Sequence, residues 1–171
     1  MSPYYRERQP RPHERRWHNY WVDRNLEDRW LEALNSLHAF KLISICEGHI
    51  AYKGRSTRTP HINLRMKRRF LRLFVRKFND LSVDLYRTFV TLFNDDDTYI
   101  DIEYKIRFKS SHRGRAINRD VVIHVRSRNP RTSEEMDEQT KRWFEQIVER
   151  LRGFDRFIKE RLLEYGGEEG H

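Results

Sequence analysis

The chain has 171 residues, 36% of them charged and 37% hydrophobic, and its mean hydropathy is −0.96. This length suits one domain with a core of its own, and the polar composition excludes a membrane protein, because no apolar run approaches the roughly 20 residues that a bilayer helix needs. The formal net charge of +9 favours a negatively charged partner.

Residues 1–22 are predicted to form a flexible arm, because they hold three of the five prolines and five arginines. Aromatic residues alternate with these arginines, as suits stacking on unpaired bases. In a second interpretation, Trp17 to Val22 pack the end of the arm onto the domain, since large aromatic side chains seldom stay exposed. The single domain is then expected over residues 23–165, followed by a flexible tail over residues 166–171.

Helical spacing begins after Asn25, which can cap a helix over residues 25–39. Alternating residues rich in β-branched side chains then predict strands over 41–46 and 61–66. A second helix is predicted over residues 67–79. Its apolar stripe consists of Phe70, Leu71, Phe74 and Phe78, and its opposite face carries Arg68, Arg72 and Arg76.

Two β-rich runs, 83–93 and 98–109, are separated by a turn-forming NDDD sequence, so an antiparallel hairpin is expected there. A polar loop over residues 109–119 leads to a last strand over residues 119–127. Thr132 and Glu135 have the spacing of a capping box, which predicts that a long helix begins there and continues to about residue 164.

This order of elements predicts an α+β two-layer sandwich, with a mainly antiparallel sheet of about five strands and three helices on one face. Strand alternation places polar side chains on the face away from the helices. These are Ser44, Cys46, His61, Asn63, Arg65, Asp101, Glu103, Lys105, Arg107, His124 and Arg126.

The charge is segregated along the chain. Ten cations and no carboxylate lie between Lys53 and Lys77, and eight cations against Asp120 alone lie between Arg107 and Arg131. Arginine outnumbers lysine by 27 to 8, and the guanidinium group is suited to phosphate and to stacking on bases. We therefore expect a nucleic-acid-binding protein, with RNA or single-stranded nucleic acid preferred. The expected phosphate contacts are Arg55, Arg58, Arg68, Arg72, Arg76, Arg113 and Arg115.

Cys46 and His49 form the sharpest local motif, because their C-x-x-H spacing lets one turn offer a thiolate and an imidazole. His61 on the next strand can complete a zinc site with them. In another interpretation Cys46 is a nucleophile polarised by His49 or His61, with His124 nearby on the same face. The remaining interpretation is structural, with Cys46 as a small buried side chain and His49 as a turn residue.

Three functions stay open from the sequence. The first is binding of nucleic acid through the arm, the segment 53–77 and the loop 109–119. The second is an enzyme acting on nucleic acid or nucleotides at Cys46, His49, His61 and His124. The third is an assembly protein whose basic segment docks on an acidic partner or on a second copy of itself. The first residues lack the apolar stretch of a secretory signal, and Cys46 has no partner for an internal disulfide, so a cytoplasmic protein is expected.

Overall fold

A computed structural model of the chain describes residues 9–50, 58–77, 83, 87–88, 91, 95, 97–131 and 133–168. Its elements in chain order are β1 (Glu14–Trp17), β2 (Tyr20–Asp23), α1 (Asp28–Asn35), β3 (Phe40–Cys46), β4 (His61–Met66), α2 (Arg68–Arg76), β5 (Thr98–Ser111), β6 (Gly114–Ser127) and α4 (Glu138–Glu168). The predicted α+β class is confirmed. The main sheet has four strands in the order β3-β4-β6-β5 where about five were predicted, and β1 and β2 form a separate two-stranded sheet.

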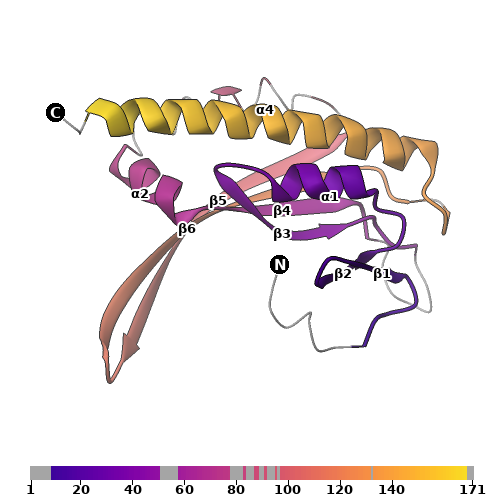
Figure 1. Cartoon of the computed structure of the whole chain (residues 1–171), viewed down its shortest axis with the longest axis horizontal. Helices are drawn as coiled ribbons and strands as arrows, with labels where there is room; N and C mark the ends of the chain where they lie inside the picture. The colour runs from indigo at the N-terminus through magenta and orange to yellow at the C-terminus, as the bar shows by residue number, and fades with distance from the viewer. Residues whose placement is uncertain are drawn as a thin grey trace.

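The helices gather on one side of the four-stranded sheet, with α4 running along the length of the molecule (Figure 1). Aromatic rings join the layers: Phe40 of β3 lies 5.7 Å from Phe154 of α4, and Trp30 of α1 lies 5.1 Å from Phe144 of α4. The indole N–H of Trp143 also donates to Thr98 Oγ1 at 3.0 Å. These contacts form one core between the sheet and the helices. None of the helices that the structure describes is long and apolar enough to cross a membrane.

β1 and β2 form a hairpin in the segment that was predicted to be an extended arm. His18 adopts a φ of 49° in the turn between the strands, a conformation that suits a two-residue hairpin loop. Trp17 and Val22 are 5% and 4% exposed and belong to the core, as the second interpretation of this segment expected. The burial of these two side chains fixes the hairpin in spite of the surrounding prolines and arginines. Residues 1–8 lie outside the described part of the chain.

α1 begins three residues later than predicted, and its N-cap is Glu27. Asn25 does not cap it, because a turn from Asp23 to Leu26 occupies this stretch and the Asn25 side chain donates to the carbonyl of Glu134. β3 and β4 lie where strands were predicted, with a bulge between Leu42 and Ser44. α2 also agrees with the prediction, and its Phe70 and Phe74 are buried.

The predicted strand over residues 83–93 is wrong. Val83, Arg87, Thr88 and Thr91 are helical, and the Thr91 hydroxyl donates to the carbonyl of Arg87 at 2.9 Å. Val83, Arg87 and Thr91 are spaced four apart and are all exposed, as on one face of a helix. The β-branched residues of this run did not decide its structure, because β-propensity depends strongly on context. The partner of β5 is instead β6.

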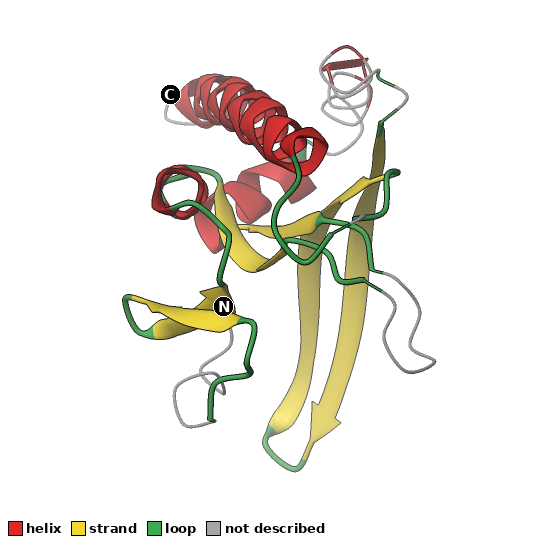
Figure 2. Cartoon of the chain, turned by 90° about the vertical axis from the view of Figure 1, so that its right-hand side faces the viewer, coloured by secondary structure: helices red, strands yellow, loops and turns green. Residues whose placement is uncertain are grey.

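β5 and β6 pair without interruption up to a tight turn in which Ser111 faces Gly114, so the predicted loop over 109–119 is also wrong. Gly114 has a φ of +123°, which favours glycine at the end of this turn. β4 pairs with β6 only between Val122 and Arg126. The outer parts of β5 and β6 therefore leave the sheet as a two-stranded ribbon about 25 Å long, at about 3.3 Å per residue, and Figure 2 shows it extending away from the helices. We call residues 105–120 the basic ribbon.

α4 begins at Glu138 and not at the predicted capping box. Asp137 is the residue that caps it, because its carboxylate accepts the backbone N–H of Thr140 at 2.6 Å. Thr132 lies outside the described residues, and Glu135 lies in a bend before the helix. The helix continues to Glu168, so the first residues of the predicted tail are helical.

Candidate functional site

The predicted site residues lie at opposite ends of the four-stranded sheet. β4 fixes the two ends, because His61 pairs with Arg126 of β6 and Arg65 pairs with Val122. Cys46 pairs with His61 at the first end, and His49 and Arg58 form a β-bridge just beyond it. α2 follows the other end of β4, beside the base of the basic ribbon (Figure 1). The segment 53–77, predicted as one basic element, is thus divided between both ends.

The basic ribbon carries six cations and a single carboxylate. The cations are Lys105, Arg107, Lys109, Arg113, Arg115 and Arg119. All except Lys105 are exposed. The carboxylate, Asp120, is paired with Arg65 of β4 at 2.9 Å. The ribbon therefore presents excess positive charge to solvent on a narrow, protruding element.

One face of the ribbon is also apolar. Phe108 faces Ile117 across the two strands, and Ile106 is the next apolar residue on the same face. Phe108 is 79% exposed, and Ile117 is 58% exposed. An aromatic ring so exposed, surrounded by cations, is available to a partner.

α2 adds arginines at the base of the ribbon. Arg68, Arg72 and Arg76 are exposed and are spaced four apart, so they share one helical face. The helix packs against β6, and its Phe74 ring lies 6.4 Å from the ring of Tyr104, just before the ribbon begins. The predicted contacts Arg68, Arg72, Arg76, Arg113 and Arg115 thus belong to two adjoining elements. Arg55 lies outside the described residues, and Arg58 lies at the other end of the sheet.

A row of polar side chains crosses the face of the sheet that no described helix covers. Asn63 Nδ2 donates to Ser44 Oγ at 2.8 Å, and His124 Nδ1 donates to Asn63 Oδ1 at 2.9 Å. His124 Nε2 then lies 3.6 Å from Glu103 Oε1. The pKa of the Glu103 carboxyl is lowered by its hydrogen bond to Lys105, with a smaller effect of His124. His124 is thus part of this row, and its printed contacts do not include Cys46.

Cys46 and His49 come together as their spacing predicted. The Cys46 sulfur lies 3.3 Å from His49 Nε2 and accepts the backbone N–H of Gly48 at 3.4 Å. Burial raises the pKa of the Cys46 thiol to about 12, and the nearby Asp23 carboxylate adds to this effect. The thiol is therefore protonated near neutral pH, which argues against its role as a thiolate nucleophile.

His61, the third predicted zinc ligand, hydrogen bonds to the backbone. Its Nδ1–H donates to the carbonyl of Thr59 at 3.2 Å. Burial lowers the pKa of His61, and the Thr59 carbonyl partly opposes this shift. Among the described residues, the side chains that gather most closely around His49 are His13 and Asp23, and not His61.

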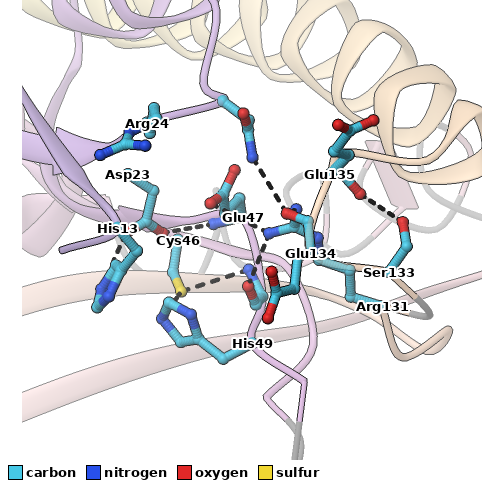
Figure 3. A network of polar contacts seen from close by, with 12 residues as sticks. His13, Asp23, Arg24, Cys46, Glu47, His49, Arg131, Ser133, Glu134 and Glu135 are labelled. Atoms are coloured by element: carbon cyan, nitrogen blue, oxygen red, sulfur yellow. Dashed lines mark hydrogen bonds and ion pairs between the residues drawn. The ribbon is translucent and has the colours of Figure 1, made fainter.

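His13 and Asp23 were missed by the sequence analysis. His13 Nε2 lies 3.7 Å from Asp23 Oδ1, and the His13 and His49 rings are 4.7 Å apart (Figure 3). The pKa of His49 is lowered, first by burial and also by the neighbouring His13, while Asp23 acts in the opposite direction. His13 lies in the segment predicted as an arm, so only the hairpin that joins it to Asp23 could have indicated this pairing.

A buried ion pair supports this end of the sheet. Arg131 Nη1 lies 3.1 Å from Glu47 Oε1, and both side chains are at least nine-tenths buried (Figure 3). Arg131 also donates to the carbonyls of Gly48 and Glu134. Gly48 has a φ of +85°, and a Cβ atom there would come within 2.8 Å of the Arg58 carbonyl. The turn after β3 is therefore closely fixed.

No family model matches this chain, and neither a curated protein nor a solved structure matches it.

Proposed function

We propose that this protein binds nucleic acid through the basic ribbon and the exposed face of α2. The observation that carries the proposal is the ribbon itself, a protruding element with six cations whose single carboxylate is already paired with Arg65. Cations placed in this way bind phosphates and release the counterions condensed around them. The predicted contacts Arg68, Arg72, Arg113 and Arg115 lie within this surface.

Phe108 supports the preference for RNA or single-stranded nucleic acid. Its ring is 79% exposed on the apolar face of the ribbon, with Arg115 and Arg119 on the same face. Unpaired bases stack on such aromatic rings, while neighbouring cations contact the backbone. This role replaces that proposed for Trp17, which is buried in the core.

A two-stranded ribbon also has the dimensions that enter the major groove of B-form DNA, which is about 12 Å wide. In that case Phe108 and Ile117 would contact the duplex as apolar side chains and not as a stacking platform. Duplex DNA is therefore the appropriate competitor in a binding experiment.

The other two functions have weaker support. A thiolate mechanism at Cys46 is opposed by a thiol pKa of about 12. Docking of the basic segment on the acidic segment of another copy is opposed by internal ion pairs, because Asp95 pairs with Arg150 and Glu103 pairs with Lys105. Nucleic-acid binding uses cations that are exposed, and we place this function in the cytoplasm.

The test is a fluorescence anisotropy titration of labelled single-stranded RNA, single-stranded DNA and duplex DNA at low salt. The ribbon variant carries Arg107→Gln, Lys109→Gln and Arg115→Gln. The matched control carries Arg142→Gln, Arg152→Gln and Arg156→Gln on exposed positions of α4, and it loses the same charge. We expect binding by the wild-type protein and the control, and a loss of at least tenfold in the ribbon variant. Failure of the wild-type protein to bind any of the three would refute the proposal.

A further inference from the structure

Three side chains that commonly bind metals converge at the end of the sheet opposite the basic ribbon. One nitrogen each from His13 and His49 and one oxygen from Asp23 lie within 4.8 Å of one another. Ligand atoms around a tetrahedral zinc ion are about 3.3–3.5 Å apart, given bonds of about 2.0–2.2 Å. His13 Nε2 and Asp23 Oδ1 are already 3.7 Å apart. Small rotations of the imidazole rings would therefore bring all three atoms to bonding distance of one ion.

The backbones that carry these side chains are fixed by hydrogen bonds. The carbonyl of His13 accepts the N–H of Arg24 at 2.8 Å, which ties it to the end of β2. His49 exchanges two backbone hydrogen bonds with Arg58, at 2.8 and 3.0 Å. The three ligands thus come from two elements of the fold that are already held in place, so the binding of an ion would require little further ordering.

Asp23 is oriented as a metal-binding carboxylate usually is. Its Oδ2 accepts the buried backbone N–H of Glu47 at 2.8 Å, which leaves Oδ1 directed toward His13. Outer hydrogen bonds of this kind orient the ligands of metal sites. Asp23 is only 7% exposed, and a buried carboxylate is costly unless a positive charge is near. A bound cation would supply that charge.

We propose that His13, Asp23 and His49 form a binding site for a divalent transition-metal ion, with zinc as the ion that best matches two imidazoles and one carboxylate. Three protein ligands leave a fourth position for water, as in zinc sites that remain open. Cys46 stays outside the ligand set and contacts His49 as a neutral thiol. The site is independent of nucleic-acid binding, because it lies at the other end of β4 from α2 and the ribbon.

The probe is zinc alone, added to chelator-treated protein and measured by calorimetry and by competition with a chromophoric chelator. We expect one zinc per chain and a rise in the unfolding temperature that follows the free zinc concentration. His49→Ala and Asp23→Asn should each weaken zinc binding by at least tenfold. Asp23→Asn keeps an oxygen for the Glu47 N–H, so it tests the charge of the ligand with little risk to the fold.

Two controls make the result specific. His38→Ala and His112→Ala remove exposed histidines elsewhere and should leave zinc affinity unchanged within about threefold. Cys46→Ala should also retain zinc, and the cobalt(II) complex should show no thiolate-to-metal charge-transfer band. Zinc binding that is absent, that survives both ligand variants, or that is lost in Cys46→Ala would overturn the proposed site. Far-ultraviolet circular dichroism would show that each variant is folded.

Discussion

The arginines of α2 should determine the salt dependence of nucleic-acid binding. In the variant with Arg68→Gln, Arg72→Gln and Arg76→Gln, three exposed cations are removed from one face of the helix. Gln has nearly the helix propensity of Arg, and the apolar face with Phe70 and Phe74 is untouched, so α2 should remain folded.

The size of the effect follows from the number of phosphates released. Each phosphate contact contributes about 0.7 to the slope of log K against log salt for a single strand, so three contacts contribute about 2. At about 0.1 M monovalent salt this corresponds to a loss of about 100-fold in affinity, or about 3 kcal/mol. The two proteins should converge toward the same affinity as the salt concentration approaches about 1 M.

The assay is anisotropy of a labelled single-stranded oligonucleotide over a series of salt concentrations. The α4 variant with Arg142→Gln, Arg152→Gln and Arg156→Gln has the same net charge and should keep the wild-type slope. An unchanged slope in the α2 variant, or an equal decrease in the α4 variant, would refute the reasoning, because the effect would then come from net charge and not from the position of the arginines.

Three further predictions concern single positions. Phe108→Ala should weaken single-strand binding by about 1–3 kcal/mol in the anisotropy assay while the unfolding temperature stays unchanged, and an equal loss with Phe108→Trp would count against stacking. Arg131→Met leaves Glu47 buried without its partner and should lower the free energy of unfolding by about 3–5 kcal/mol in urea melts; the double variant with Glu47→Leu should be more stable than this single one. Burial lowers the pKa of His61, so its neutral form stabilises the fold fully above the unfolded-state pKa of about 6.5 and this contribution is lost as the pH falls toward the lower folded value. Wild-type stability should therefore decrease more between pH 7.5 and 5.5 than that of His61→Gln, and parallel urea-melt profiles would contradict this assignment.

The parts of the fold with a strong local pattern were predictable. β3 and β4 lie where alternation placed them, and α2 has the predicted apolar stripe. The alternation also placed Asn63 and His124 on one face, where they are hydrogen bonded. In these segments the burial pattern and the local preference of the residues agree.

The basic ribbon shows why other parts were not predictable. Residues 109–119 are polar and contain Gly114, a composition typical of a loop, yet their backbones pair from Ser111 and Gly114 inward. Pairing between strands needs no buried side chain, so no hydrophobic period marks it. The helical positions at Val83 and Arg87 failed for a related reason, because a short β-branched run does not distinguish a strand from a helix.

The metal-binding cluster depends on contacts that are distant in sequence. Cys46 and His49 were found from their spacing, which lies within one turn. His13 and Asp23 approach them only because the β1–β2 hairpin folds back beside the end of β3. Its prolines and arginines indicated an arm, while the burial of Trp17 that fixes it is a tertiary effect.

The central claim is that nucleic acid binds at the ribbon and α2, and a residue-resolved titration tests it most directly. Amide chemical shifts of ¹⁵N-labelled protein would be followed while a short single-stranded oligonucleotide is added at low salt. We predict that the largest changes occur over residues 105–120 and 68–76, and that amides around His13 and His49 at the opposite end of the sheet change little. Changes centred on His13 and His49, or no saturable change along the ribbon, would contradict the account.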